Sequence, residues 1–291
     1  MNYNLNIKKE TLPNGLQVIL VHKPDYQRSL FLLGAKVGGF DIDQNVDGSI
    51  VHHKSGLAHY LEHQMFYLDG EDVSELFANL QCSTNAYTSY TETAFYFSTT
   101  ADVKKPLKLL LKFVENLDVT EDTIEKEKGI ILSEYDMYQQ SPEQRLFKET
   151  LVSLYKYHPM KVDVLGSKED IQNMSMEDLK QFYELNYDSS KLCLVGVTGK
   201  DTDDVMNWIK ECQKDVINLH QEKEYNDDGV RMFFRNFVNI EVEKQLKDEV
   251  NKYKEKQKRR IIDVYNAFNE DIPNEIKKIK GFVFNVRKQQ D

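Results

Sequence analysis

Two histidines one helical turn apart constrain this chain more than any other feature. They lie in the stretch Gly56-Leu57-Ala58-His59-Tyr60-Leu61-Glu62-His63-Gln64-Met65-Phe66. If this stretch is a helix, His59 and His63 stand at i and i+4 on one face, and Glu62 flanks them on the same side. Two neutral imidazoles at this spacing suit a tetrahedral zinc ion, and an adjacent carboxylate can take a proton from zinc-bound water. The alternative is a polar helix face that merely carries two histidines, and five residues alone are compatible with both.

A second helix offers the remaining ligand, because a zinc ion held by two histidines needs a further protein ligand and one position open to water. In the helix predicted after the capping residue Thr120, one face carries Glu127, Ile130, Ile131 and Glu134, at i, i+3, i+4 and i+7. Carboxylates in an apolar stripe are costly to bury unless a partner such as a metal compensates them. The alternative is that both face solvent on a charge-rich helix. Together with the histidine pair, the pattern indicates Glu134 as the third ligand and Glu127 as a group that orients a histidine.

Strand and helix signals alternate along the first 215 residues. The turn Leu12-Pro13-Asn14-Gly15-Leu16 predicts a tight hairpin, and Ser141 before Pro142 predicts a helix start. Apolar strands are predicted at 17–22, 30–37, 83–99 and 191–198, and helices at 74–80, 106–114, 120–137, 176–186 and 202–214. Residues 38–54 are mostly polar and are predicted to be a loop. The pattern favours an α+β fold with a mixed, mostly antiparallel sheet and helices packed on one face.

The composition changes after about residue 215. Residues 241–260 are crowded with Lys, Glu, Gln and Arg and carry only a thin apolar stripe, which is typical of a charged, solvated helix. Residues 281–286 are apolar enough for an edge strand. We therefore predict a first domain at residues 1–215 and a charged helical C-terminal segment at residues 216–291.

Charge and composition argue against several classes of partner. The net charge of −10 disfavours nucleic-acid binding, which needs a basic surface. No run approaches the ~18 apolar residues that a membrane span needs, and residues 1–21 lack the basic and apolar regions of a signal peptide. The three cysteines, Cys82, Cys193 and Cys212, are widely separated and form no CxxC pair. We expect reduced, buried thiols and a cytoplasmic location.

The order of these motifs resembles that of the pitrilysin family, which includes insulin-degrading enzyme and the mitochondrial processing peptidase. His59-x-x-Glu62-His63 has the inverted zinc-binding order of the inverzincins, and Glu127-x6-Glu134 follows downstream. Further matches are Leu12-Pro13-Asn14-Gly15-Leu16, Asn85-Ala86-Tyr87-Thr88-Ser89, Phe95-Tyr96, His158-Pro159 with Gly166 and Ile171, and Leu194-Val195-Gly196-Val197-Thr198-Gly199. The resemblance covers about residues 5 to 215 and is strongest to short bacterial processing-peptidase-like members.

The resemblance implies a zinc-dependent endopeptidase that uses one zinc ion and acts on peptides or extended protein segments. It implies His59, His63 and Glu134 as zinc ligands and Glu62 as the general base.

It also implies that an extended peptide pairs with an edge strand. Here that strand would be 93–98, with Asn85 and Ala86 just before it, so the predicted substrate contacts are Asn85, Ala86, Thr93 and Phe95. The alternative is that Phe95, Tyr96 and Phe97 are ordinary core, which we expect for the inward-facing side chains.

The sequence departs from the family pattern after residue 215. Family members pair this domain with a second, similar one that supplies an Arg and a Tyr near the scissile carbonyl, and no residue here matches that pair. Residues 216–291 are at most a remnant of such a domain. We therefore expect a homo-oligomer or hetero-oligomer that supplies the missing half, or a truncated relative with weak activity. A further alternative is a non-catalytic subunit that stabilises a sister peptidase, although such subunits generally lose part of the zinc set, which is intact here.

Overall fold

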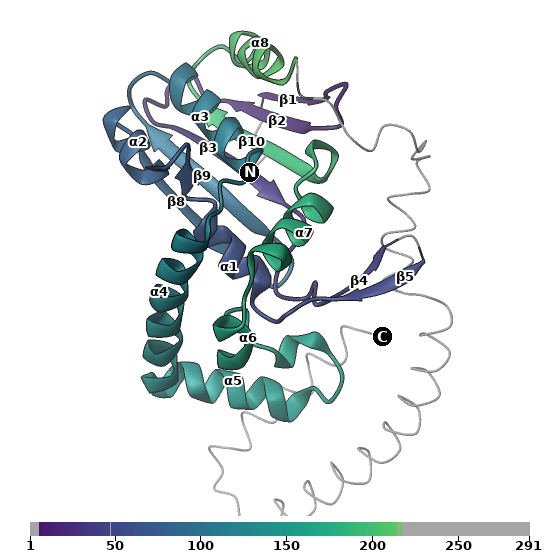
Figure 1. Cartoon of the computed structure of the whole chain (residues 1–291). Helices are drawn as coiled ribbons and strands as arrows, with labels where there is room; N and C mark the ends of the chain where they lie inside the picture. Colours follow the sequence, from purple (N-terminus) through teal and green to yellow (C-terminus); the bar gives the residue numbers. More distant parts are fainter. Residues whose placement is uncertain (1–5, 47, 215, 217–291) are drawn as a thin grey trace, which may run out of the picture. The chain divides into compact units, whose positions relative to one another are not determined.

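A six-stranded sheet lies at the centre of the computed structural model, which describes residues 6–46, 48–214 and 216 (Figure 1). Its strands lie in the order β1-β2-β10-β3-β9-β8. Their bounds are Asn6–Thr11 for β1, Gln17–His22 for β2, Ser29–Ala35 for β3, Ser83–Thr88 for β8, Thr93–Thr99 for β9 and Leu192–Thr198 for β10. Neighbouring strands are antiparallel except β2 and β10, which run parallel.

Helices pack on one face of this sheet. Along β3 and β10 every second side chain is buried, and the buried positions Leu33, Phe95 and Leu194 lie side by side on three neighbouring strands. The helices that contact the strands are α1 (Leu57–Gln64), α2 (Val73–Asn79), α3 (Lys104–Val114) and α8 (Thr202–Gln213). The predicted fold class is therefore confirmed.

The other helices continue from this layer. They are α4 (Glu121–Gln140), α5 (Pro142–Leu154), α6 (Lys168–Gln172) and α7 (Met176–Asn186), with short 3-10 turns at Pro159–Lys161 and Ser189–Lys191. Helix α4 packs against α1, α5 and α6, and α7 packs against α1. The helix that carries the histidine pair is thus held between the sheet and two other helices.

Local sequence signals explain where several elements begin. The hairpin of β1 and β2 turns at Gly15, whose φ of +88° favours glycine. Thr120 accepts a hydrogen bond from the backbone N–H of Thr123 and starts α4 with a capping box. Ser141 caps α5 with Pro142 at its first position, as predicted.

Two predictions of local structure are wrong. Residues 38–54 are not all loop, because β4 (Asp43–Val46) and β5 (Ser49–His52) form a separate hairpin there. The stretch 83–99 is not one strand but two, β8 and β9, joined by a turn in which the backbone N–H of Ser89 donates to the carbonyl of Glu92. A further small hairpin pairs β6 (Tyr67–Leu68) with β7 (Glu71–Asp72).

The second of these errors relocates the sheet edge. β9 is paired on both sides, with β3 and with β8, so the prediction that 93–98 is the edge strand is wrong. The edge strand next to β9 is β8, which carries Asn85 and Ala86, and the opposite edge of the sheet is β1.

Some predictions fall outside the part of the chain that the structure describes. The helix at 241–260 and the strand at 281–286 belong to this group, and the domain division at 215/216 stays a prediction. Among the described helices, none combines the length and the apolar character needed to span a membrane.

Candidate metal centre

Helix α1 carries polar side chains into the interior of the domain. It begins after Gly56, whose φ of +79° places it in the left-handed region. Leu57, Tyr60 and Leu61 anchor the helix in the core, while His59 is 8% exposed and Glu62 9% exposed. The rings of His59 and His63 meet edge to face, with centroids 4.8 Å apart and an interplanar angle of 66°. The i, i+4 spacing therefore delivers both imidazoles to one buried place, as the sequence predicts.

Glu134 reaches the histidines from α4. Its Oε2 lies 3.7 Å from Nε2 of His59 and 3.6 Å from Nε2 of His63. One ligand atom from each of the three residues lies within 4.8 Å of the other two. Tetrahedral zinc with bonds of about 2.0–2.1 Å sets nitrogen and oxygen ligands roughly 3.3–3.4 Å apart. The two distances from Glu134 exceed this separation by only a few tenths of an ångström, and the donor types of the three side chains suit a zinc ion.

Glu127 lies two helical turns before Glu134 and contacts His63 on its other ring nitrogen. Its Oε2 is 3.0 Å from Nδ1 of His63, and its Oε1 accepts a hydrogen bond of 2.7 Å from the Tyr67 hydroxyl. A proton on Nδ1 leaves Nε2 of His63 with a free electron pair for a metal. Sequence reasoning placed Glu127 beside a histidine but missed Tyr67, which lies in the short strand after α1.

Glu62 is held by the edge strand. The Thr88 hydroxyl on β8 donates a 2.6 Å hydrogen bond to Oε2 of Glu62, and the Thr93 hydroxyl lies 3.5 Å from that of Thr88. This contact leaves the other carboxylate oxygen of Glu62 available. Burial raises the pKa of Glu62, while the hydrogen bond from Thr88 lowers it. Thr88 belongs to the motif at residues 85–89, but its inward direction follows only from the strand register.

Opposite pKa shifts separate the two histidines. Burial, together with the neighbouring His63, lowers the pKa of His59 to about 4. Burial also disfavours a charged His63, but its contacts with Glu127 and Glu134 outweigh that and raise its pKa to about 9. The contact with His63 lowers the pKa of Glu134 despite burial. The site therefore holds two ionised carboxylates around one imidazole that carries a proton when no metal is bound.

The predicted substrate contacts separate into two groups. Asn85 is exposed and Ala86 half-buried on β8, at the edge of the sheet. Thr93 and Phe95 are fully buried on β9, so they lie in the core rather than at an edge. The alternative that Phe95 and Phe97 are core residues is the one that their burial supports. Contacts of any of these residues with substrate stay a prediction.

Two histidines on one helix, a carboxylate from a second helix and an adjacent buried glutamate define the class of inverted zinc-peptidase centres. The comparison with known families agrees: residues 47–168 match the insulinase family, peptidase family M16. The predicted resemblance is confirmed, and the matched region of this chain belongs to that family.

Individual relatives place the match in context. The chain is 34% identical over 209 residues to the uncharacterized zinc protease YmfH of Bacillus subtilis, covering 70% of this chain and 48% of the relative. It is 27% identical over 195 residues to the mitochondrial-processing peptidase subunit beta of Neurospora crassa, covering 65% and 39%. A protease structure from Helicobacter pylori superposes with a TM-score of 0.68 at 27% identity, covering 76% of this chain and 53% of that one. The chain thus spans about half the length of the relatives it matches.

Proposed function

We propose that this chain is the zinc-binding half of a zinc-dependent endopeptidase that cleaves peptides or extended protein segments. The observation that supports this most directly is the convergence of His59, His63 and Glu134 within 4.8 Å, with the Glu62 carboxylate beside them. Relatives that carry the name zinc protease support the coarser assignment to zinc proteases.

The proposed roles of the side chains follow from their contacts. A zinc ion held by His59, His63 and Glu134 would polarise the carbonyl of the peptide bond to be cleaved and lower the pKa of a bound water. Glu62 would be the general base, whose second carboxylate oxygen would take a proton from water and pass it to the leaving amine. Thr88 keeps the Glu62 carboxylate oriented, and Glu127 keeps His63 in the tautomer whose Nε2 binds metal.

The proposed substrate site is the outer side of β8. No described strand pairs with that side, so its backbone groups can pair with an extended peptide. Asn85 and Ala86 are the predicted residues that remain in position for such contacts. We further propose an oligomer that supplies a second half, because relatives are named as subunits of the mitochondrial-processing peptidase, and a cytoplasmic location, as expected from the unpaired Cys82, Cys193 and Cys212.

A second candidate function is a non-catalytic subunit that stabilises a sister peptidase. The observation that favours it is that relatives are named as one subunit, subunit beta, of the mitochondrial-processing peptidase. The two candidates differ in what the purified chain does when zinc is bound.

The test combines metal content with hydrolysis of a quenched peptide by the full chain, with and without a chelator. We expect one zinc ion per chain and chelator-sensitive cleavage. Glu62→Gln should keep the zinc and lose about 10²- to 10⁴-fold in rate, since it removes the general base. A Glu62→Gln chain as active as wild type would contradict the assignment. Bound zinc without cleavage, together with a stable complex with a longer peptidase, would favour the second candidate.

A further inference from the structure

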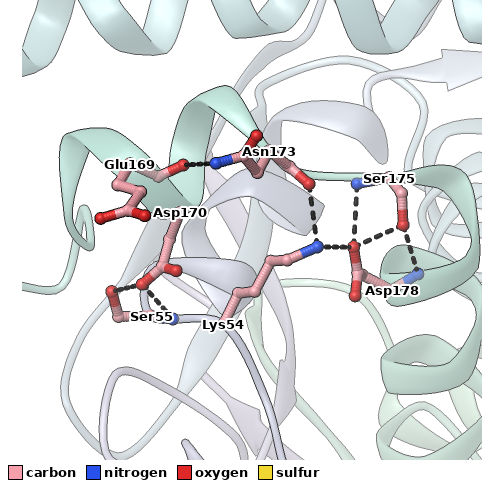
Figure 2. Close-up of polar contacts among 7 residues, drawn as sticks. All are labelled: Lys54, Ser55, Glu169, Asp170, Asn173, Ser175 and Asp178. Atoms are coloured by element: carbon pink, nitrogen blue, oxygen red, sulfur yellow. Dashed lines mark hydrogen bonds and ion pairs between the residues drawn. The ribbon is translucent and has the colours of Figure 1, made fainter.

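The short helix α6 contacts α4 and is also hydrogen-bonded to Ser55, just before α1, so it is linked to both helices that carry the proposed zinc ligands. It packs against α4, and the fully buried Ile171 fixes it in the core. Lys168 of α6 contacts the carboxylate of Asp136 at 3.0 Å, two residues beyond Glu134 on α4. On its other side, Asp170 faces Ser55, which directly precedes the start of α1 (Figure 2).

Ser55 is joined to α6 through three hydrogen bonds. Its hydroxyl and its backbone N–H both donate to Oδ2 of Asp170, the latter at 3.1 Å. The same hydroxyl accepts a 2.9 Å hydrogen bond from the backbone N–H of Ser167. Ser55 is only 9% exposed, so losing its partner would leave a largely buried hydroxyl unsatisfied.

The next residue packs against the turn before α6 with no space for a side chain. A Cβ on Gly56 would lie 2.1 Å from the carbonyl oxygen of Leu165, and one on Gly166 would lie 2.3 Å from that of Ser55. Both glycines have positive φ, of +79° and +86°. The two backbone segments therefore touch directly, and the start of α1 cannot shift without moving the turn that leads into α6.

Lys54 extends the same junction to α7. Its Nζ donates to the backbone carbonyl of Asn173 at 2.8 Å and to Oδ2 of Asp178 at 2.5 Å (Figure 2). Asp178 also accepts a 2.9 Å hydrogen bond from the backbone N–H of Ser175 in the capping box of α7. Three consecutive residues before α1 are thus fixed to the segment between residues 165 and 178.

The geometry of α1 makes this junction relevant to the metal centre. The helix has only eight residues, and His59 lies in its first turn, so the position of Ser55 and Gly56 sets where both imidazoles lie. Glu134 comes from α4, which α6 contacts on its other side. Metal sites tolerate ligand distances within about 0.2 Å, so small changes in the separation of α1 and α4 alter affinity.

We propose that Asp170, acting through Ser55, is a positioning residue of the zinc site: α6 braces α1 against α4 so that His59, His63 and Glu134 converge. This inference rests on the proposed function, because it takes these three residues to be zinc ligands. The exposed Lys168–Asp136 ion pair contributes little by itself, since its side chains are 48% and 54% exposed. The link between α6 and the start of α1 therefore depends on the hydrogen bonds between Asp170 and Ser55.

The experiment measures zinc affinity of the full chain by competition with a chromophoric chelator, and the visible spectrum of the cobalt-substituted protein. Asp170→Asn should weaken zinc binding about tenfold, the lower end of what partners outside the ligand shell contribute. It should also change the cobalt spectrum, which reports ligand geometry. Glu169→Gln is the matched control, because it removes the same charge from an exposed neighbour on α6 and should leave both readouts unchanged.

A second variant keeps the test informative if Asp170→Asn folds poorly. Ser55→Ala removes the hydroxyl from the other side of the contact and should weaken zinc binding by a similar factor. The double variant should lose no more zinc affinity than the more strongly affected single variant, because both changes break the same contact. Wild-type zinc binding with both variants within about twofold of it would overturn the brace while leaving the zinc site intact. A wild-type chain that binds no zinc would overturn the proposed function, and the brace with it.

Discussion

Two clusters of buried polar side chains in this domain contain similar groups but are arranged differently. In the contact between α3 and α8, Nδ2 of Asn14 donates to Oε1 of Gln213 at 2.6 Å. Nε2 of Gln213 in turn donates to both carboxylate oxygens of Glu115 at 2.9 Å. Each of these bonds joins a donor to an acceptor. At the metal centre, by contrast, one possible ligand atom each from His59, His63 and Glu134 lies near a common point, where a single cation can bind all three.

The difference separates a structural cluster from a functional one. The Asn14–Gln213–Glu115 chain satisfies its members in pairs and links the first hairpin to two helices. Without a metal, the proton on His63 keeps its contacts with Glu127 and Glu134 favourable, and a bound cation would take the place of that proton. Burial of a carboxylate is therefore weak evidence for function, and convergence of electron-pair donors is stronger evidence.

The largest expected effect is the pH dependence of zinc binding. His63 must lose its proton to bind zinc, and with a pKa of about 9 it holds that proton below pH 9. His59, with a pKa of about 4, has already lost its own. Zinc affinity should therefore fall about tenfold per unit as pH is lowered from about 8 to about 6. Titration with a competing chelator measures this slope, and a pH-independent affinity would place zinc elsewhere.

The next effect tests the contact between Glu127 and His63. Glu127→Gln removes the carboxylate that orients His63 and supports its basicity, so zinc affinity should fall about 10- to 100-fold. Glu125→Gln is the control on the same helix, because its side chain is 66% exposed and forms an ion pair with Lys128. Equal zinc affinities for the two variants would show that Glu127 does not support zinc binding and has a structural role instead.

A smaller effect is expected at Thr88. Thr88→Val keeps the shape of the side chain but removes the hydrogen bond to Glu62, so kcat/KM for a quenched peptide should fall about tenfold. Zinc affinity should not change, because Thr88 touches no proposed ligand, and Thr88→Ser should restore the rate. A loss of zinc affinity in Thr88→Val would instead mean that β8 helps to hold the zinc ligands in place rather than to orient Glu62.

The smallest effect has the opposite sign and concerns the structural cluster. Burial outweighs the hydrogen bond from Gln213 and raises the pKa of Glu115 from 4.5 to about 7. Between these values the folded chain binds more protons than the unfolded chain, so the free energy of unfolding falls as pH rises through this range.

Glu115→Gln removes this penalty and should stabilise the chain at about pH 8 by about 1 kcal/mol, with little change near pH 5. Urea unfolding of both proteins at the two pH values measures the difference. Equal stability at both would show that Glu115 is not buried as a charge.

Much of the fold follows from local signals. Asn14-Gly15 sets the first hairpin, and Thr120 and Ser141 set the starts of α4 and α5. The β4–β5 hairpin packs little against the core, so its strands show no alternating apolar pattern from which a hairpin could be predicted. The turn between β8 and β9 uses Ser89 to Glu92, which contain no Gly, Pro or Asn, and one long strand was predicted in its place.

The candidate site likewise contains features that the sequence predicts and features that it does not. The spacing of His59 and His63 and the helix face of Glu134 are properties of single helices, and sequence alone places them. Thr88 against Glu62 and Asp170 against Ser55 depend on register and packing between distant segments. Such contacts leave no periodic trace in the chain, so they become visible only in three dimensions.

The place of β10 in the sheet has a consequence for how the nascent chain folds. β2 and β3 leave the ribosome early, yet the strand that lies between them is β10, the last strand of the described residues. Until residue 198 has emerged, β1 with β2 and β3 with β9 and β8 are two separate pieces, each with an open inner edge. A translation product that stops before β10 therefore exposes the unpaired edges of β2 and β3, which can pair with other chains. The sheet is complete only when β10 inserts between them.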